Sequence, residues 1–277
     1  MLINEGNSIF RINDFVHGRD TTFHLQPSVV EKAAQRVLAA LPDINRFNGT
    51  PRNYAAFREC LPKNHAAPLV LVVGGSILGH GMEELVAERS LELVATDVSM
   101  GPLTVLVCDS HDLPFDDETF DGVIVQAVLE HVVDPGRCVD EIHRVLKPRG
   151  VLYAETPFMQ QVHMGPYDFT RFTHSGHRRL FRHFTELASG AGGGPGMALA
   201  WSYQYFLLSF AESRPVRGLL FAFAQCTSFF LKYFDNYLVS KRGAIDAASG
   251  FFFLGRKDGA TLSDRELIDY YRGGMSK

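Results

Sequence analysis

The stretch LVLVVGGSILGHGMEEL, residues 69–85, decides the fold of this chain. Leu69–Val73 is a continuous apolar run rich in β-branched residues, which is typical of a strand buried on both faces of a parallel sheet. Gly74 and Gly75 follow at once, and the residues from Met82 onward have the composition of a helix. Glycine lets a ligand approach the main chain closely, and the N-terminus of the next helix offers free N–H groups. The stretch therefore predicts a strand–turn–helix unit with a ligand at the turn.

The alternation of strand and helix continues beyond this unit. Residues 91–96 predict a second strand with Asp97 at its carboxyl end, and residues 105–108 predict a third strand that ends at Asp109. An acid about 20 residues after a glycine turn can accept hydrogen bonds from both hydroxyls of a ribose. The acid after the third strand can accept from an adenine amino group. The ordered set of glycine turn, Asp97 and Asp109 indicates a nucleotide-type ligand on a parallel sheet.

Two further strands complete the parallel part of the predicted sheet. Residues 120–125 predict the fourth strand and residues 151–155 the fifth, with a helix over residues 138–146 between them. Residues 126–131 form the loop after the fourth strand. Ligands of open α/β sheets bind outside the carboxyl ends of the strands. This loop and the segment after the fifth strand therefore lie on the predicted active face.

These motifs together carry a family resemblance. The glycine turn, TDVS, CDSHDLPF, FDGVIVQAVLEHV and EIHRVLKPRGVLYAETP resemble class I S-adenosylmethionine-dependent methyltransferases, and above all the type 11 group. The resemblance covers residues 68–185. It implies an α/β, Rossmann-like, seven-stranded sheet of order 3-2-1-4-5-7-6 with strand 7 antiparallel, and S-adenosylmethionine as the cofactor. The cofactor-binding residues that it implies are Gly74, Gly75 and Ser76 in the turn, Asp97 at the ribose, Asp109 and Ser110 at the adenine, and Gln126 beside the methionine part.

The sequence departs from the family pattern at three places. Val72 stands where the family has an acid two residues before its first glycine, and the usual GxGxG is the longer GGSILGHG. Only Gly74 aligns without ambiguity, which leaves the contacts near Gly79 and Gly81 open. Arg149 replaces the first glycine of the KPGG turn. That turn is structural, so the change puts little in doubt.

The chemistry of methyl transfer narrows the search for catalytic residues. Transfer from a sulfonium is an in-line displacement, in which the enzyme aligns donor and acceptor and excludes water. An alcohol acceptor also needs a base or a metal ion to remove its proton, whereas a carboxylate acceptor needs neither. Polar residues on the predicted active face can supply a base and can bind the acceptor. The catalytic candidates are His131, His163 and Asp168, and the substrate-binding candidates are Tyr167, Arg171 and His174.

Each candidate has a structural alternative. The LEH triplet that contains His131 is common in this family for unrelated acceptors, so this histidine can be a structural hydrogen-bonding group. Asp168 and Arg171 can pair to hold their loop. His111, beside the adenine site, is either cofactor-facing or solvated. A metal-assisted mechanism through Asp and His residues of the loop stays open, but no ligand spacing in the sequence demands a metal ion, and we predict no metal ligand.

The segment after the fifth strand carries a second resemblance. Its pattern HxxPYDFxRFTxxGxRxLF, residues 163–181, is similar to a subgroup of these methyltransferases that is often found with polysaccharide and glycolipid biosynthesis genes. That similarity suggests a sugar hydroxyl as the acceptor.

The chain divides into four segments by composition and pattern. The predicted segments are an N-terminal helical extension (1–67, with a helix after Ser28 and a short helix over 54–61), a cofactor-binding core (68–189), an aromatic-rich helical insertion (190–249), and a last strand with a polar tail (250–277).

The insertion between the sixth and seventh predicted strands is open to two interpretations. Its glycine-rich residues 190–196 predict a flexible turn, and residues 197–213 and 215–239 predict two helices. The helices either cover the sheet or form a homodimer contact, or they present an apolar surface to a lipid-bearing acceptor or a membrane. Aromatic residues surround the second helix, and a helix that is apolar all round is usually buried, which favours the first interpretation.

Composition limits the class of protein and its setting. The chain has 277 residues, 46% of them hydrophobic, and a formal net charge of −4, which gives no broad surface for nucleic acid. The four cysteines form no CxxC pair, which indicates a reducing, cytoplasmic setting. The N-terminus lacks the apolar region of a signal peptide. The longest uncharged run of the aromatic region, Gly218–Leu231, is shorter than the roughly 18 residues that a membrane span needs.

The sequence predicts a cytoplasmic S-adenosylmethionine-dependent methyltransferase that acts on an oxygen of a small molecule or saccharide, including a lipid-linked one. Two other classes stay open. An NAD-type oxidoreductase also has an acid after a glycine turn, although the LPF…VLEHV…LKPRG run argues against it. A non-catalytic S-adenosylmethionine-binding scaffold would explain the altered glycine turn.

Overall fold

The computed structural model describes residues 41–46, 49–63, 67–77, 79–87, 90–259 and 261–275. The helix predicted after Ser28 lies outside the described residues. The short helix predicted over residues 54–61 is present as the longer α3 (Thr50–Cys60), which begins with a proline in its first turn.

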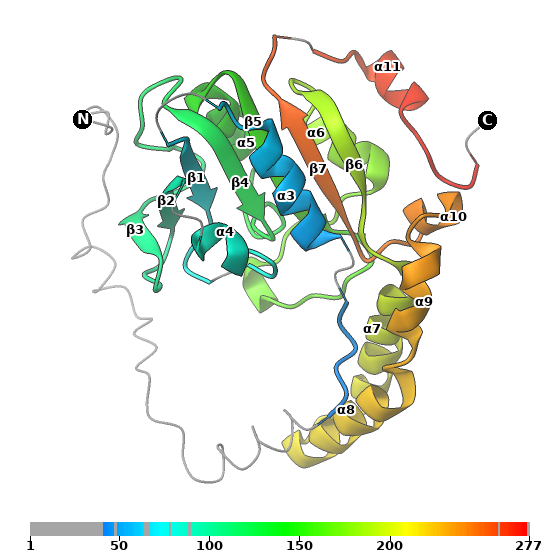
Figure 1. Cartoon of the computed structure of the whole chain (residues 1–277). Helices are drawn as coiled ribbons and strands as arrows, with labels where there is room; N and C mark the ends of the chain where they lie inside the picture. Colours follow the sequence, from blue (N-terminus) through cyan, green and yellow to red (C-terminus); the bar gives the residue numbers. More distant parts are fainter. Residues whose placement is uncertain are drawn as a thin grey trace.

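A seven-stranded sheet of order β3-β2-β1-β4-β5-β7-β6 forms the centre of the protein, as predicted (Figure 1). Strands β1 to β5 are parallel, and β7 is antiparallel to both of its neighbours. All carboxyl ends of the parallel strands therefore meet at one edge. The strands are β1 (Leu69–Val73), β2 (Glu92–Asp97), β3 (Thr104–Val107), β4 (Phe120–Gln126), β5 (Leu146–Pro157), β6 (Thr185–Gly193) and β7 (Gly250–Arg256).

Helices cover both faces of the sheet. In Figure 1, α3 crosses one face, and α5 and α6 lie on the other. Two buried apolar clusters match these layers, one containing Tyr54 and Phe57 of α3 and the other containing Ile142 of α5 and Phe181 beyond α6. The helices after α3 are α4 (Glu83–Ala87), α5 (Pro135–Val145), α6 (His174–Leu180), α7 (Pro195–Leu208), α8 (Arg214–Ser228), α9 (Leu231–Leu238), α10 (Arg242–Ile245) and α11 (Asp264–Asp269), with a 3-10 turn η1 (Gly165–Tyr167).

The prediction of a flexible turn over residues 190–196 was wrong. Residues as far as Gly193 extend β6 and pair with β7, where Gly193 lies opposite Gly250. Helix α7 begins directly afterwards. The buried Asp235 of α9 accepts hydrogen bonds from the N–H groups of Gly196 (2.7 Å) and Met197 (2.9 Å). A Cβ at Gly196 would lie 2.2 Å from the Leu231 carbonyl oxygen, so these glycines allow α9 to cap α7.

The second predicted helix of the insertion is two helices, α8 and α9, and they extend away from the sheet with α7 (Figure 1). The interpretation that this insertion covers the sheet was therefore wrong for α8. Large apolar side chains on these three helices and in the turns that join them are exposed in the described part of the chain. They include Phe206, Phe210, Leu219, Phe223, Phe230, Tyr233, Phe234 and Tyr237. No helix among the described residues is long and apolar enough to cross a membrane.

The predicted polar tail contains a helix, α11, which the sequence analysis missed. Ser263 and Glu266 form a capping box, in which each side chain accepts a hydrogen bond from the main-chain N–H of the other residue. The Ser-x-x-Glu spacing is a readable start signal for a helix. The tail is tied back to the core by Arg182, whose main-chain oxygen accepts from Leu262 N at 3.0 Å.

Arg149 occupies a strained position in the turn that joins α5 to the main part of β5. Its φ is +65°, in the left-handed region that favours glycine. We expect Arg149→Gly to stabilise the protein by about 0.5–1 kcal/mol, because relief of about 1–2 kcal/mol of strain exceeds the added freedom of glycine in the unfolded chain. Urea unfolding measures this. Arg149→Ala keeps a Cβ in the same conformation, so an equal gain in that variant would show that strain is not the cause.

Candidate active site

The glycine turn after β1 is held between β2 and the loop after β4. The N–H groups of Gly74 and Gly75 both donate to the Thr96 carbonyl, at 2.8 and 2.9 Å. Gly74 has a φ of +77°, and a Cβ there would lie 2.2 Å from Cγ2 of Val128. A Cβ at Gly75 would lie 2.7 Å from that of Ala95. Gly74 is therefore required by the close approach of the loop that carries His131, and Gly75 by the close approach of β2.

Asp97 lies at the end of β2, directly beside this turn. Its Oδ2 accepts from Ser76 N at 3.1 Å, and its Oδ1 accepts from Ser99 N at 2.9 Å. A Cβ at Gly101 would lie 2.1 Å from the Ser76 carbonyl oxygen. The main chain on both sides thus fixes the half-buried carboxylate where a ribose hydroxyl can donate to it.

Asp109 and its neighbours form a rigid corner after β3. Oδ1 of Asp109 accepts from the main-chain N–H of His111 at 2.9 Å and lies 2.6 Å from its Nδ1. Burial tends to raise the pKa of Asp109, but these hydrogen bonds outweigh it and hold the pKa below its ordinary value. His111 Nε2 accepts from Asp134 N at 3.1 Å, so both ring nitrogens are engaged. The Ser110 hydroxyl is buried, 3.3 Å from the sulfur of Cys138.

Gln126 joins α3, the glycine turn and β5 through its side-chain amide. Its Nε2 donates to Glu155 Oε2 (2.7 Å) and to the His80 carbonyl (3.2 Å), and its Oε1 accepts from the Tyr54 hydroxyl (2.8 Å). Gly79 allows this arrangement, because a Cβ there would lie 1.8 Å from Gln126 Oε1. Glu155 is buried, which raises the pKa of its carboxyl group. The sequence analysis missed Tyr54 and Glu155, although an acid at the end of a buried strand was a readable signal.

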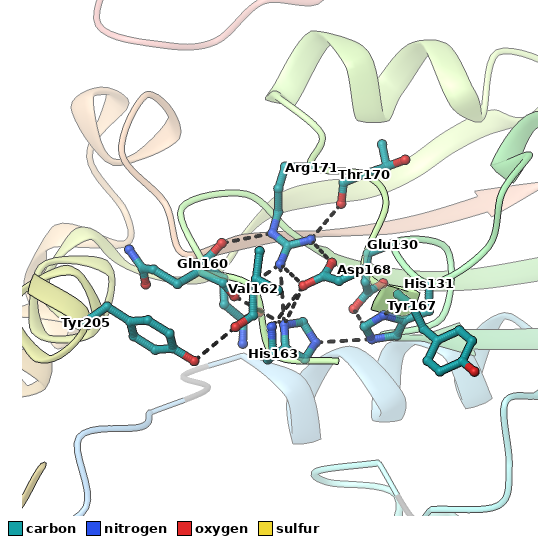
Figure 2. A network of polar contacts seen from close by, with 11 residues as sticks. Glu130, His131, Gln160, Val162, His163, Tyr167, Asp168, Thr170, Arg171 and Tyr205 are labelled. Atoms are coloured by element: carbon teal, nitrogen blue, oxygen red, sulfur yellow. Dashed lines mark hydrogen bonds and ion pairs between the residues drawn. The ribbon is translucent and has the colours of Figure 1, made fainter. Parts of the chain in front are cut away.

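Two histidines from different loops meet at the carboxyl edge of β4 and β5 (Figure 2). His131 Nε2 and His163 Nε2 are 3.1 Å apart, and the ring centroids are 4.8 Å apart. His131 Nδ1 lies 2.8 Å from the Tyr167 carbonyl oxygen. The structure thus brings His131 and His163, 32 positions apart in the sequence, into contact. The third predicted catalytic residue, Asp168, contacts His163 from the other side.

Asp168 and Arg171 pair in the loop after β5, as the structural alternative predicted. The Asp168 side chain is only 1% exposed, and Arg171 Nη2 donates to its Oδ2 at 2.6 Å while Nη1 donates to its Oδ1. This guanidinium holds the pKa of Asp168 at about 2. Arg171 also donates to the carbonyls of Gln160, Thr170 and Gln161. All five of its N–H groups are therefore used within the loop.

Glu130 is a site residue whose role the sequence analysis missed. Its side chain is 1% exposed, and burial raises its pKa to about 7. Neither carboxylate oxygen has a hydrogen-bond partner among the described residues. Oε1 lies 3.7 Å from His131 Nε2. The main-chain oxygen of Glu130 accepts from Phe169 N (2.8 Å) and Thr170 N (3.2 Å), which fixes the loop after β5 onto the loop after β4.

The remaining predicted substrate-binding residues differ in exposure. Tyr167 is 59% exposed, and Figure 2 shows its ring directed away from the histidine pair. His174 at the start of α6 is 7% exposed, and its ring lies edge-on to Phe251 with centroids 5.6 Å apart. Tyr167 is therefore accessible to an acceptor, whereas His174 is part of the packing behind the loop.

A cavity of about 670 Å³ lies between the loop after β5 and α7. Its lining includes Gln161, Phe169 and Arg171 of the loop and Ser202 and Phe206 of α7. The mixture of amide, guanidinium and aromatic side chains suits an acceptor that has both polar and apolar parts.

Comparison with known proteins gives the following relationships. Residues 74–154 match a methyltransferase domain family. A demethylmenaquinone methyltransferase of Symbiobacterium thermophilum is 34% identical over 94 residues, which are 33% of this chain and 38% of that protein. A ubiquinone/menaquinone biosynthesis C-methyltransferase of Geotalea daltonii is 32% identical over 85 residues, which are 30% of this chain and 36% of that protein. The chain thus spans little more than a third of the length of these relatives.

Among solved structures, the phosphoethanolamine N-methyltransferase 2 of Haemonchus contortus in complex with phosphomonomethylethanolamine and S-adenosylhomocysteine is similar in fold. The TM-score is 0.51 at 15% identity, over 82% of this chain and 57% of that chain. At this identity the likeness concerns the fold.

The strand order, the glycine turn and the two acids at the ends of β2 and β3 define a class I S-adenosylmethionine-dependent methyltransferase domain. Within that class, the matched residues 74–154 belong to the methyltransferase domain family of the type 11 group. The cofactor of this domain is S-adenosylmethionine, and the residues present fit it. We propose that it is held by Gly74, Gly75 and Ser76, Asp97, Asp109, Ser110 and Gln126.

Proposed function

We propose that this chain transfers the methyl group of S-adenosylmethionine to a hydroxyl oxygen of a small molecule or saccharide. The observation that carries the proposal is the contact between His131 and His163 at the carboxyl edge of β4 and β5. The loop that carries His131 also packs against Gly74 of the glycine turn through Val128. A carboxylate acceptor needs no group that removes a proton. A polar cluster with facing imidazole nitrogens at this edge therefore favours an alcohol acceptor.

The proposed reaction is a displacement at the methyl carbon. The acceptor O–H bond breaks and its proton goes to the histidine cluster. The oxygen lone pair forms the new C–O bond, and the C–S bond electrons return to sulfur, which gives S-adenosylhomocysteine and a methyl ether. Cofactor chemistry supplies the positively charged sulfonium, while the residues of this chain align the oxygen and exclude water.

The three predicted catalytic residues have different proposed roles. His163 is the partly exposed base candidate, and His131 stands beside it. Asp168 is held charged by Arg171 and is a poor base, because a carboxyl group with a pKa of about 2 takes up little proton at neutral pH. Its Oδ2 lies 3.4 Å from His163 Nδ1 and accepts from His163 N at 3.0 Å. We therefore assign Asp168 to positioning His163.

The loop after β5 and the exposed surface of α7, α8 and α9 support the proposed acceptor class. The similarity of residues 163–181 to methyltransferases near polysaccharide and glycolipid genes supports a saccharide. Exposed aromatic side chains on α7, α8 and α9, including Phe206 at the cavity, support an apolar or lipid-linked portion of the acceptor. The same surface also suits peripheral membrane contact or a homodimer contact.

A second candidate is methylation of a ring carbon of a quinone-type acceptor. The names of the relatives from Symbiobacterium thermophilum and Geotalea daltonii suggest it, and the exposed aromatic surface of α7–α9 is compatible with an apolar ring. Nuclear magnetic resonance of the ¹³C-methylated product separates the two, since methyl carbons bonded to oxygen and to ring carbon have distinct chemical shifts.

His163→Ala tests the proposed role of the histidine pair. We expect turnover to fall by about 10²-fold or more while binding of S-adenosylhomocysteine stays unchanged, because removal of general-base catalysis typically costs this much. The measurement uses methyl transfer to a panel of saccharide, lipid-linked and quinone acceptors, with His183→Ala as the matched histidine control. Unchanged turnover in His163→Ala would remove this residue from the mechanism. Cofactor binding without turnover on any acceptor would favour a non-catalytic binding protein.

A further inference from the structure

The Nε2 atoms of His131 and His163 face each other at a distance that requires a proton or a cation between them. A carbonyl oxygen can only accept, so the 2.8 Å contact of His131 Nδ1 with the Tyr167 carbonyl places the proton of the neutral ring on Nδ1. Its Nε2 then carries a lone pair. That lone pair points to a region where His163 Nε2 lies 3.1 Å away.

The surroundings of His163 favour the same tautomer. Its Nδ1 lies 3.4 Å from both the Gln161 carbonyl oxygen and Asp168 Oδ2, which are acceptors. Arg171 Nη2 is also 3.4 Å away, but its N–H groups already donate to Gln161 O and Asp168 Oδ2. With the proton on Nδ1, the lone pair of His163 Nε2 faces that of His131. Two lone pairs at this distance repel each other unless a cation or a proton lies between them.

Glu130 supplies the third group of the cluster. It is buried, its carboxylate oxygens have no hydrogen-bond partner among the described residues, and one ligand atom from each of Glu130, His131 and His163 lies within 4.8 Å of the others. A buried carboxylate without a partner is costly. A proton shared by the histidines would give Glu130 only a 3.7 Å ion pair with His131 and no hydrogen bond, whereas a metal ion would engage all three side chains at once.

We propose that Glu130, His131 and His163 form a binding site for one divalent transition-metal ion. Metal–nitrogen bonds of about 2.0–2.1 Å at octahedral to tetrahedral angles separate two imidazole nitrogens by about 2.8–3.4 Å, and the observed 3.1 Å lies in that range. Ligating histidines usually donate their other N–H to a carbonyl or carboxylate. His131 does so to Tyr167, and His163 has Gln161 and Asp168 in reach. Two histidines and one carboxylate leave coordination positions open for an acceptor oxygen.

The metal site rests on the proposed function for the acceptor hydroxyl and for the methyl transfer, and it replaces direct transfer of the hydroxyl proton to the histidines. A divalent ion that coordinates the acceptor hydroxyl lowers the pKa of that hydroxyl. The proton of that hydroxyl would leave to bulk water, its oxygen would form the new C–O bond to the methyl carbon, and the C–S electron pair would return to sulfur. With the ion bound, both Nε2 atoms are ligands, so His163 does not itself take up the proton.

Calorimetric titration of the chelator-stripped full chain with Zn²⁺ or Co²⁺ tests the site. We expect one ion per chain at the site, weakened about 100-fold or more in His131→Ala and His163→Ala and about 10-fold or more in Glu130→Gln. His183→Ala, whose ring lies 3.0 Å from the Thr261 hydroxyl, should bind as the unmodified protein does. Co²⁺ absorption should report nitrogen ligation. Glu130→Gln keeps the shape and removes the buried charge, so it remains informative if a histidine variant fails to fold.

Four outcomes separate the site from the proposed function. No binding, or equal binding in the three ligand variants and the control, would overturn the metal site. Methyl transfer that persists at full rate after chelation would overturn the role of the ion and leave His163 as the base. An ion bound as expected, with no acceptor methylated, would support the site and count against the proposed function. Turnover restored to stripped protein by Zn²⁺ or Co²⁺ would support both.

Discussion

Asp97→Ala is expected to weaken binding of S-adenosylmethionine and S-adenosylhomocysteine by about 10²- to 10⁴-fold. Two hydrogen bonds from ribose hydroxyls to a carboxylate contribute about 1.5–3 kcal/mol each, and each 1.4 kcal/mol is a factor of 10. Asp97 also accepts from Ser76 N at 3.1 Å, so its loss releases the glycine turn as well. Calorimetric binding to the purified full chain measures the effect.

The control for this variant is Asp140→Ala, which removes an exposed acid on α5. Its affinity for both ligands should be unchanged. NAD serves as the competing ligand, because an acid after a glycine turn also suits a dinucleotide. The assignment of Asp97 to the ribose would be contradicted if the unmodified protein preferred NAD. It would also be contradicted if Asp97→Ala bound S-adenosylhomocysteine as tightly as the unmodified protein.

The strands of the central sheet could be predicted because each of their signals is local, whereas their order came from the family resemblance. The apolar run Leu69–Val73 is β1 with the same bounds, and residues 251–254 lie within β7. The glycine-rich end of β6 could not be predicted from its composition. Its conformation depends on pairing with β7 and on Asp235 of α9 reaching the start of α7, and these are contacts between segments far apart in the chain.

In the candidate site, too, several residues could be predicted from local sequence, but their contacts could not. His131 and His163 could be named from residue type and from their place after buried strands. Their 3.1 Å contact could not, because it depends on the loop after β5 being fixed to the Glu130 main-chain oxygen by Phe169 N. Glu130 was passed over because burial, and not residue type, is what makes its carboxylate unusual. The aromatic residues of α7–α9 are a case in which the sequence pattern predicted burial but the side chains are exposed.

Arg171→Ala is expected to destabilise the protein by about 3–5 kcal/mol, because it leaves a buried carboxylate without its partner. Asp168 is 1% exposed and receives two charged hydrogen bonds from Arg171. The same side chain ties down the carbonyls of Gln160, Gln161 and Thr170. Arg171→Lys should recover only part of the loss, since an ammonium group cannot make the forked contact. Urea unfolding at neutral pH measures these differences.

Two comparisons isolate the buried charge as the cause. Arg179→Ala breaks an ion pair with Asp264, which is 70% exposed, and should cost less than about 1 kcal/mol. In an Asp168→Asn background, Arg171→Ala should cost clearly less than in the native chain, because no charge is left unpaired. Equal costs in both backgrounds would mean that Arg171 stabilises the loop through the carbonyl contacts alone.

The pH dependence of stability gives an independent check of the same pair. Arg171 holds the pKa of Asp168 at about 2, below its value of about 4 in the unfolded chain. A depressed folded-state pKa contributes stability that is present above pH 4 and is lost as the pH falls toward 2, here about 2.7 kcal/mol. Arg171→Ala removes this contribution at neutral pH. The stability difference between the two proteins should therefore narrow from pH 4 to pH 2, and a constant difference across that range would locate the effect in neutral hydrogen bonds instead.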